Sequence, residues 1–226
     1  EFVSGNPKAP DADTALLFSG LASRQAKAGA AAIATFDKVR KDYAESQHMA
    51  RVLVELGTLQ FETKAMAKAR TALEEVATKH AQSKWRPNAE YILGFVARGE
   101  DKPDEAIQHF AFVAGVKEHD LAADARFQQG MILMGKKDHK GAEGAFKQLL
   151  GDHADFNKKD EATFSLGQSL EQQERWDEAL AEYGKVGGFQ ESGWRDNALY
   201  QSAWCEIGAK REPKAVEFYG RLLAEF

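Results

Sequence analysis

The sequence of 226 residues has one cysteine, five prolines and little excess charge of either sign. A single cysteine cannot form an internal disulfide, so cysteine usage does not indicate the redox compartment. With a net charge of -5, the chain lacks the positive field that attracts nucleic acid or anionic lipid. No apolar run approaches the roughly 20 residues that span a bilayer. These absences exclude a disulfide-stapled domain, a basic nucleic-acid binder and a membrane-spanning segment.

Motifs for catalysis and cofactor binding are also missing. The segment Gly184-Lys-Val-Gly187-Gly188 matches neither a phosphate-binding loop nor a dinucleotide fingerprint, and we interpret it as a helix end followed by a turn. Cys205 has no histidine near it in sequence, and the six histidines form no pair with metal-ligand spacing. Four carboxylates are predicted to lie on a solvated outer face: Glu171, Glu174, Asp177 and Glu178. We therefore predict no catalytic residue, no metal site, no cofactor and no enzymatic activity.

What the sequence does contain is a repeat with a period of 36 or 37 residues. Each of six copies has a small residue, then alanine 12 residues later, an aromatic residue or leucine after 16, and valine or leucine after 19. The last three columns keep one helical face apolar, while the small residue indicates the close approach of two helices, with the alanine expected opposite it. The four columns are Gly20, Gly57, Gly94, Gly130, Gly167 and Ala203; Ala32, Ala69, Ala106, Ala142, Ala179 and Ala215; Phe36, Leu73, Phe110, Phe146, Tyr183 and Tyr219; and Val39, Val76, Val113, Leu149, Val186 and Leu222.

Each copy predicts two antiparallel helices that cannot bury their apolar faces alone, so that six stacked pairs share one continuous core. The chain has no signal-peptide pattern at its start and stops within a helical pattern, from which we expect a piece excised from a longer protein. The predicted organisation is a disordered leader at 1–10 and repeats at 11–47, 48–84, 85–120, 121–157, 158–193 and 194–226, the last of them truncated.

These columns resemble the tetratricopeptide repeat, in which Leu-Gly in the first helix is followed by alanine after 12 residues and by an aromatic residue after 16. Leu56-Gly57, Leu93-Gly94 and Leu166-Gly167 fit this spacing, and the similarity covers residues 11–226. The resemblance implies an all-α fold, a right-handed α-solenoid of about six antiparallel helix-turn-helix repeats. The long period and endings such as Tyr43-Ala-Glu-Ser46 are similar to the subclass common in bacterial envelope proteins, including outer-membrane assembly lipoproteins and cell-division coordinators. That similarity implies a periplasmic or outer-membrane-associated protein, with the cytoplasm as the alternative.

A second apolar stripe on the first helix of each copy supplies the candidate binding residues. Positions −3, +1 and +4 from the small residue share one helical face, which in the resembled family lines the concave groove. Aromatic and methionine side chains are enriched at protein interfaces, but the same rings can also fill contacts between successive helices. Full burial of Phe95, Met131 and Trp204 would exclude the groove hypothesis. The candidates are Tyr91, Phe95, Arg98, Phe127, Met131, Met134, Phe164, Tyr200 and Trp204.

The sequence therefore predicts a non-catalytic scaffold that binds a partner peptide or helix in an aromatic-lined concave groove, as part of a bacterial envelope complex. The −3 column contains no lysine, which disfavours the clamp by which some members of the family hold acidic C-termini. Two alternatives stay open. One is a regulatory or substrate-recruiting arm of a larger enzyme. The other is self-association through the last repeat, where Phe218, Leu222 and Leu223 present an apolar end.

Overall fold

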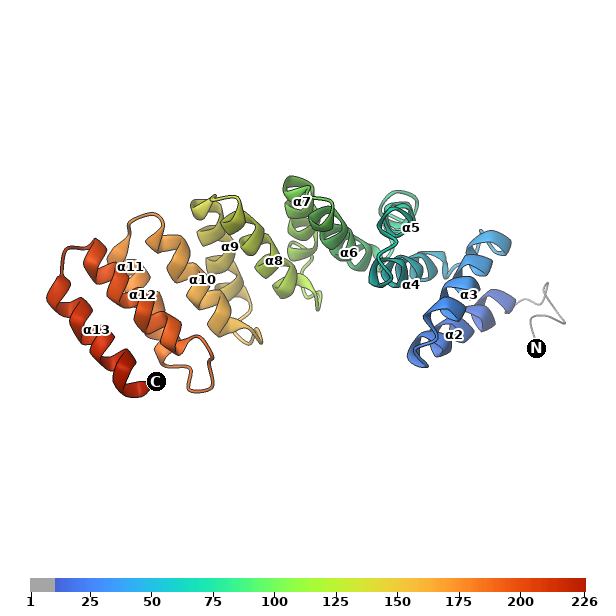
Figure 1. Cartoon of the computed structure of the whole chain (residues 1–226). Helices are drawn as coiled ribbons and strands as arrows, with labels where there is room; N and C mark the ends of the chain where they lie inside the picture. Colours follow the sequence, from blue (N-terminus) through green and yellow to red (C-terminus); the bar gives the residue numbers. More distant parts are fainter. Residues whose placement is uncertain (1–10) are drawn as a thin grey trace. The chain divides into compact units, whose positions relative to one another are not determined.

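The computed structural model describes residues 11–226, in which it contains twelve α-helices and no β-strand (Figure 1). The chain divides into two compact units, residues 1–121 and 122–226. The leader predicted at residues 1–10 lies outside the described residues. The all-α repeat fold predicted from the period is confirmed.

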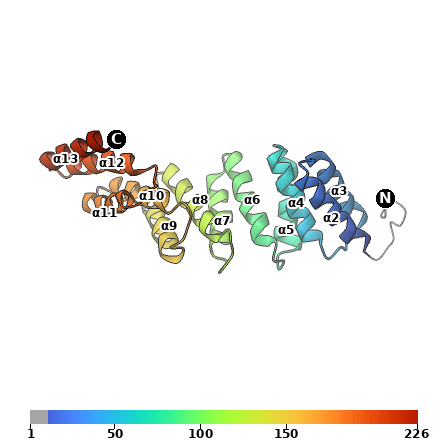
Figure 2. The same cartoon turned by 90° about the horizontal axis from the view of Figure 1, so that it is seen from below.

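The first unit consists of three helix pairs, shown from two directions in Figures 1 and 2. Its helices are α2 (Ala12–Gln25), α3 (Gly29–Asp42), α4 (Met49–Glu62), α5 (Met66–Lys79), α6 (Arg86–Gly99) and α7 (Pro103–Ala114). Successive helices within this unit are in contact, and α4 also packs against α6. Neighbouring pairs in this unit therefore share one core.

The second unit repeats this arrangement with three further pairs. Its helices are α8 (Ala122–Gly135), α9 (His139–Asp152), α10 (Lys159–Glu171), α11 (Trp176–Gly187), α12 (Arg195–Gly208) and α13 (Glu212–Glu225). Successive helices are again in contact, and α8 also packs against α10. Each of the six residue ranges predicted for a repeat contains one of the six helix pairs.

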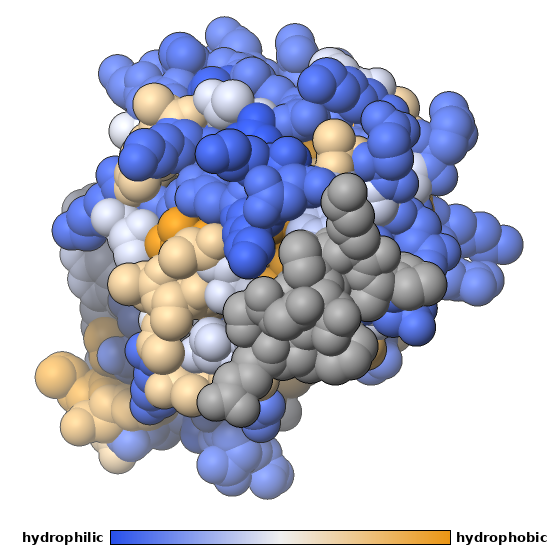
Figure 3. All heavy atoms as spheres, turned by 90° about the vertical axis from the view of Figure 1, so that its right-hand side faces the viewer, coloured by the Kyte–Doolittle hydropathy of each residue, from blue (hydrophilic) through white to orange (hydrophobic). Residues whose placement is uncertain are grey.

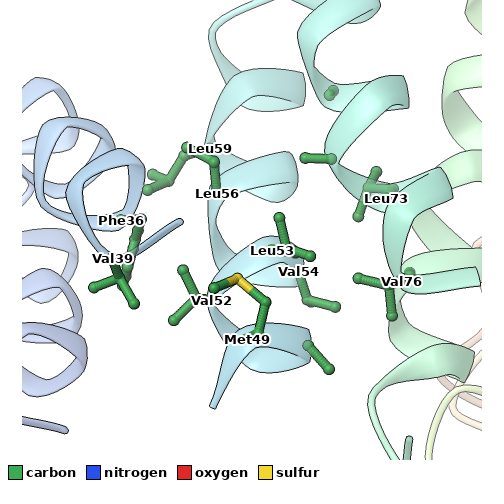
Figure 4. Close-up of a cluster of buried hydrophobic side chains, with 14 of the residues drawn as sticks. Phe36, Val39, Met49, Val52, Leu53, Val54, Leu56, Leu59, Leu73 and Val76 are labelled. Atoms are coloured by element: carbon green, nitrogen blue, oxygen red, sulfur yellow. The ribbon is translucent and has the colours of Figure 1, made fainter. Parts of the chain in front are cut away.

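The periodic columns form the core of both units. All six alanines of the second column are buried, and in the third column Phe36, Phe110, Phe146 and Tyr183 are at most 1% exposed. Figure 4 shows this core in the first unit, where the apolar side chains of α4 lie between those of α3 and α5. Burial of each large apolar side chain contributes about 1.5–3 kcal/mol, which makes these columns the main source of stability.

The glycine column faces a different partner from the one predicted. A Cβ atom at Gly94 would lie 2.7 Å from Cζ of Phe110, and a Cβ atom at Gly130 would lie 2.7 Å from Cε1 of Phe146. The prediction that the alanine of the second helix lies opposite the glycine is therefore wrong, because the side chain four residues after that alanine occupies the space. The same contact joins Gly20 to Phe36, Gly57 to Leu73 and Gly167 to Tyr183.

A residue with left-handed backbone conformation follows the first helix of every pair. Its φ lies between 58° and 61°, and it stands seven residues after the small residue of the first column. At Lys137 the backbone N–H donates to the carbonyl of Met134 (2.9 Å), which closes the end of α8. No member of the set is glycine, so composition gives no signal for this turn. The residues are Lys27, Lys64, Asp101, Lys137, Glu174 and Lys210.

Replacing Lys137 with glycine is expected to raise the free energy of unfolding by about 0.5–1 kcal/mol. A non-glycine residue in this conformation costs about 1–2 kcal/mol, and the backbone entropy that glycine loses on folding offsets part of the gain. Denaturant unfolding checks the value. The matched control is Lys140→Gly in the first turn of α9, where φ is helical and a loss of up to about 1 kcal/mol is expected. A loss of stability in both variants would contradict the prediction.

Ion pairs connect neighbouring helix pairs within each unit. In the first unit Arg70 of α5 binds Glu100, at the end of α6, with a distance of 2.8 Å. In the second unit the buried carboxylate of Glu143 on α9 accepts hydrogen bonds from Arg175 (2.6 Å) and Lys147 (2.7 Å). Burial alone would raise the pKa of Glu143, but these bonds and one from Gln173 lower it to about 2.

The Glu143→Gln variant is expected to lose about 2 kcal/mol of unfolding free energy at about pH 7. The folded-state pKa lies below the ordinary value of 4.5, so the ionised carboxylate stabilises the fold above pH 4.5. That contribution disappears as the pH falls toward 2, so the stabilities of variant and wild type should converge there. Denaturant unfolding across this range tests the trend, with Glu191→Gln in an exposed linker as the control. A difference that is independent of pH would contradict it.

Candidate interaction surface

In the first unit the candidate residues form a cluster of half-buried rings on α4 and α6. The ring of Phe95 lies 5.1 Å from that of Tyr91 and 6.3 Å from that of Phe61, measured between centroids. Phe110 packs beneath it at 5.1 Å, and the guanidinium of Arg98 lies 4.9 Å above its face. The structure thus brings Tyr91, Phe95 and Arg98 together, as the spacing predicts for one helical face.

Few large apolar side chains are exposed elsewhere on this unit. Among its described residues only Phe18 of α2 is a large, strongly exposed hydrophobic side chain, with 60% of its surface accessible. Figure 3 views the molecule from the right-hand side of Figure 1, where α2 and α3 lie. Hydrophilic residues cover most of that view, and hydrophobic atoms gather in a smaller area at its centre and lower left.

The second unit exposes more of its candidate face. Met131 on α8 is 39% exposed, and on α12 Tyr200 and Trp204 are 44% and 46% exposed. The rings of Tyr200 and Trp204 are 6.3 Å apart between centroids, and the ring of Tyr219 on α13 lies 6.2 Å from that of Tyr200. Met134, three residues after Met131 on α8, is half-buried. These side chains present apolar surface to solvent at the first helices of the fourth and sixth pairs.

Two candidate phenylalanines in the second unit do not expose their rings to solvent. Phe127 and Phe164 are each only 4% exposed, so we no longer count them among the binding residues. Each is covered by an aromatic residue from the linker after the next helix. Phe156 lies 5.8 Å from Phe127, and Trp194 stacks on Phe164 at 4.9 Å. Sequence reasoning did not use these linker residues, and the repeat gives no signal for them, because Phe156 lies 11 residues before Gly167 whereas Trp194 lies 9 residues before Ala203.

The exposure test leaves the groove hypothesis open. Phe95 is half-buried, while Met131 and Trp204 are exposed, so none of the three is fully enclosed in the core. Partner binding by these residues therefore stays a prediction, and it concerns each unit by itself.

Glu171 is the one carboxylate whose placement differs from the prediction in a way that affects this face. It was predicted on a solvated outer face, which is wrong: it is half-buried at the end of α10, and its Oε2 accepts a hydrogen bond from the Tyr183 hydroxyl (2.6 Å). Burial raises the pKa of Glu171, and burial together with Glu171 also raises the pKa of Tyr183. Within residues 11–226 no Lys, Arg or His forms an ion pair with this carboxylate.

The described residues offer little for catalysis or metal binding. Cys205 is fully buried, and burial raises the pKa of its thiol to about 12, which keeps it protonated and unreactive at neutral pH. In residues 11–226 no three His, Cys, Asp or Glu side chains gather closely enough to hold a metal ion. None of the helices in that range is long and apolar enough to cross a membrane.

Comparison with protein families identifies the repeat. A family model described as a tetratricopeptide repeat-like domain matches residues 8–155. The chain belongs to the tetratricopeptide repeat family. Two further tetratricopeptide repeat models match residues 141–186 and 197–226 of this tetratricopeptide repeat protein. Among curated protein sequences none matches the chain.

Solved tetratricopeptide repeat structures have a similar fold. One is YrrB, described as a TPR protein with an unusual peptide-binding site, with 17% identity and a TM-score of 0.68 over 84% of this chain and 91% of that one. A structure of the MamA protein gives 14% identity and a TM-score of 0.67 over 79% and 92%. MamA from Desulfovibrio magneticus RS-1 gives 14% and 0.62 over 78% and 94%. At these identities the likeness shows the fold alone.

Proposed function

We propose that this tetratricopeptide repeat protein is a non-catalytic scaffold whose second unit binds a segment of a partner protein. The observation that carries the proposal is the exposure of Met131, Tyr200 and Trp204 on the first helices of their pairs. Large aromatic and methionine side chains dominate protein interfaces, and exposing them without a partner leaves apolar area in water. Peptide binding by the similarly folded YrrB supports this mode of action.

The partner segment that binds to this surface is extended or helical and has apolar side chains. Met131 lies next to α10, since the Ser165 hydroxyl is 3.8 Å from its sulfur. Methionine adapts to irregular apolar shapes, while Tyr200 and Trp204 add large rings with a polar atom at one edge. Helix-in-groove and extended-peptide recognition both use anchors of this kind. The face therefore favours a peptide with spaced apolar anchors over a small polar ligand.

Selection from a library of random peptides displayed on phage, with the full chain as bait, tests this function. Dissociation constants of the selected synthetic peptides are then measured by fluorescence anisotropy on wild type and on a Met131→Ser, Tyr200→Ser double variant. We expect binding to the variant to be at least about tenfold weaker. The control is Phe18→Ser, which removes an exposed ring from the other unit and should leave binding unchanged. Equal binding to wild type and double variant would contradict the proposal.

Self-association is a second candidate, favoured by the outer face of α13. Val216 and Leu223 on this helix are 69% and 86% exposed, the largest exposure of any large aliphatic side chain among the described residues. Sedimentation velocity over a range of concentrations tests it, with Leu223→Asp as the variant expected to abolish any dimer. A monomer at all concentrations would remove this candidate.

The cellular setting is proposed from the repeat alone. The long period and the Tyr43-Ala-Glu-Ser46 type of ending favour a bacterial envelope protein in the periplasm or at the outer membrane. Fractionation of the native host with an antibody to this chain tests that location. Recovery in the cytoplasmic fraction would contradict it.

A further inference from the structure

The outer face of α13 is less covered than the same face of the other second helices. In the first five pairs the third and fourth columns are at most 1% exposed, and the first helix of the next pair packs against α3, α5, α9 and α11. On α13 the same columns are Tyr219 and Leu222, which are only half-buried, and Val216 and Leu223 are exposed. This helix therefore presents to solvent one half of a junction between helix pairs.

Helix α2 presents the other half of such a junction. Phe18 stands two residues before the small residue of its helix and is 60% exposed. In two later first helices the residue at this position contacts the preceding pair. Glu55 of α4 pairs with Arg24 of α2, and the Ser165 hydroxyl of α10 donates to the sulfur of Met131 on α8 (3.8 Å). Phe18 therefore lies on the side of α2 that would face a preceding helix pair.

The register of these contacts matches the two exposed faces to each other. Glu55 and Arg24 occupy positions −2 and +4 from the small residue, and the equivalent residues are Phe18 on α2 and Ile207 on α12. The contact between Ser165 and Met131 joins positions −2 and +1, and its equivalent joins Phe18 to Trp204. If the α2 end of one copy packs on the α12 end of another, three large apolar side chains meet there.

The second helices match in the same way. Within the first unit Arg70 of α5, one residue after its column alanine, pairs with Glu105 of α7, one residue before its own. The equivalent residues are Val216 on α13 and the exposed Ala31 on α3. Both internal ion pairs thus correspond to apolar pairs at the two exposed faces, and neither apolar pair places a charge in the contact.

We infer that the α12–α13 face of one copy, formed by Trp204, Ile207 and Val216, binds the α2–α3 face of a second copy, formed by Phe18 and Ala31. The inference rests on self-association, the second candidate function, and names the surface that α13 meets. The two faces differ, so the contact is heterologous. It removes apolar area from water on both sides, whereas a symmetric contact of α13 with itself would leave Phe18 exposed.

Mixing two blocked variants tests this inference by sedimentation velocity. Phe18→Asp blocks the α2–α3 face and Val216→Asp blocks the α12–α13 face, and each leaves the other face intact. Wild type should associate as its concentration rises, and each variant alone should associate at least about tenfold more weakly. An equimolar mixture of the two variants should form a complex of two chains and nothing larger. The control Ala67→Asp, at an exposed position of α5, should associate like wild type.

Other outcomes separate the inference from the candidate function on which it rests. If Phe18→Asp associates like wild type, or if the mixture of variants stays monomeric, the heterologous contact is overturned while self-association stands. Wild type that is monomeric at every concentration would overturn both. Peptide binding is measured separately, at protein concentrations below any association, and does not depend on this result. Both substituted side chains are exposed, and circular dichroism checks that the variants are folded.

Discussion

Replacing Phe146 with alanine is expected to lower the free energy of unfolding by about 3–5 kcal/mol, the largest stability change predicted for this chain. The side chain is fully buried between α8 and α9, and its ring occupies the space that Gly130 leaves free. Removal of such a ring loses its transfer free energy and leaves a cavity that the surrounding helices fill incompletely. Denaturant unfolding monitored by circular dichroism measures the loss.

The contact with Gly130 makes this change strongly non-additive. Gly130→Ala alone is expected to cost about 1–3 kcal/mol, since its Cβ would lie 2.7 Å from the Phe146 ring. In the Phe146→Ala background the same methyl group enters the vacated space, and Gly130→Ala should then be neutral or stabilising by up to about 1 kcal/mol. The matched control is Gly144→Ala, at an exposed position of α9 with nothing within 4 Å of the added methyl, which should stabilise.

A coupling energy near zero between Gly130 and Phe146 would contradict this account of the glycine column. It would mean that the glycine is tolerated for a reason other than the approach of the ring. Destabilisation by Gly144→Ala would equally count against it, because that position has room for a side chain.

The repeat period was enough to predict most of the fold, since four columns of apolar and small residues in six copies allow only stacked helix pairs. The side chain that packs against each glycine could not be predicted in the same way. Spacing shows that a small residue and a ring recur together, but the rotation of one helix against the other decides whether alanine or the ring faces the glycine. The left-handed turn residues were also hidden, because lysine, aspartate and glutamate occupy positions where glycine would have been the expected signal.

The candidate site could be predicted only by position, because exposure depends on residues outside the helix that carries it. Phe164 and Tyr200 occupy the same −3 position, yet one is 4% and the other 44% exposed. Trp194 stacks on the first, whereas the ring contacts of Tyr200 are with Trp204 and Tyr219. Glu171 illustrates the same limit. The carboxylates that follow it in sequence are exposed, and only the structure shows that Glu171 is half-buried against the Tyr183 hydroxyl.

Trp204→Ala is expected to weaken binding of the selected peptides by about thirtyfold or more, corresponding to roughly 2 kcal/mol or more of binding free energy. Tryptophan is the residue most often dominant at interfaces, and here the indole is the largest exposed ring of the second unit. Because 46% of the residue is already in solvent, truncation should change the unfolding free energy by less than about 1 kcal/mol.

The comparison with Trp204→Phe tests whether apolar ring area accounts for the effect of Trp204→Ala. Phenylalanine keeps an apolar ring of smaller area and lacks the indole N–H, so it should recover most of the affinity that Trp204→Ala loses. Val216→Ala on α13, at 69% exposure, removes apolar surface away from the proposed face and serves as the control. Anisotropy titrations of one selected peptide on all three variants measure these differences. If Trp204→Ala and Val216→Ala reduce affinity equally, Trp204 is not an anchor, and the exposed ring needs another explanation.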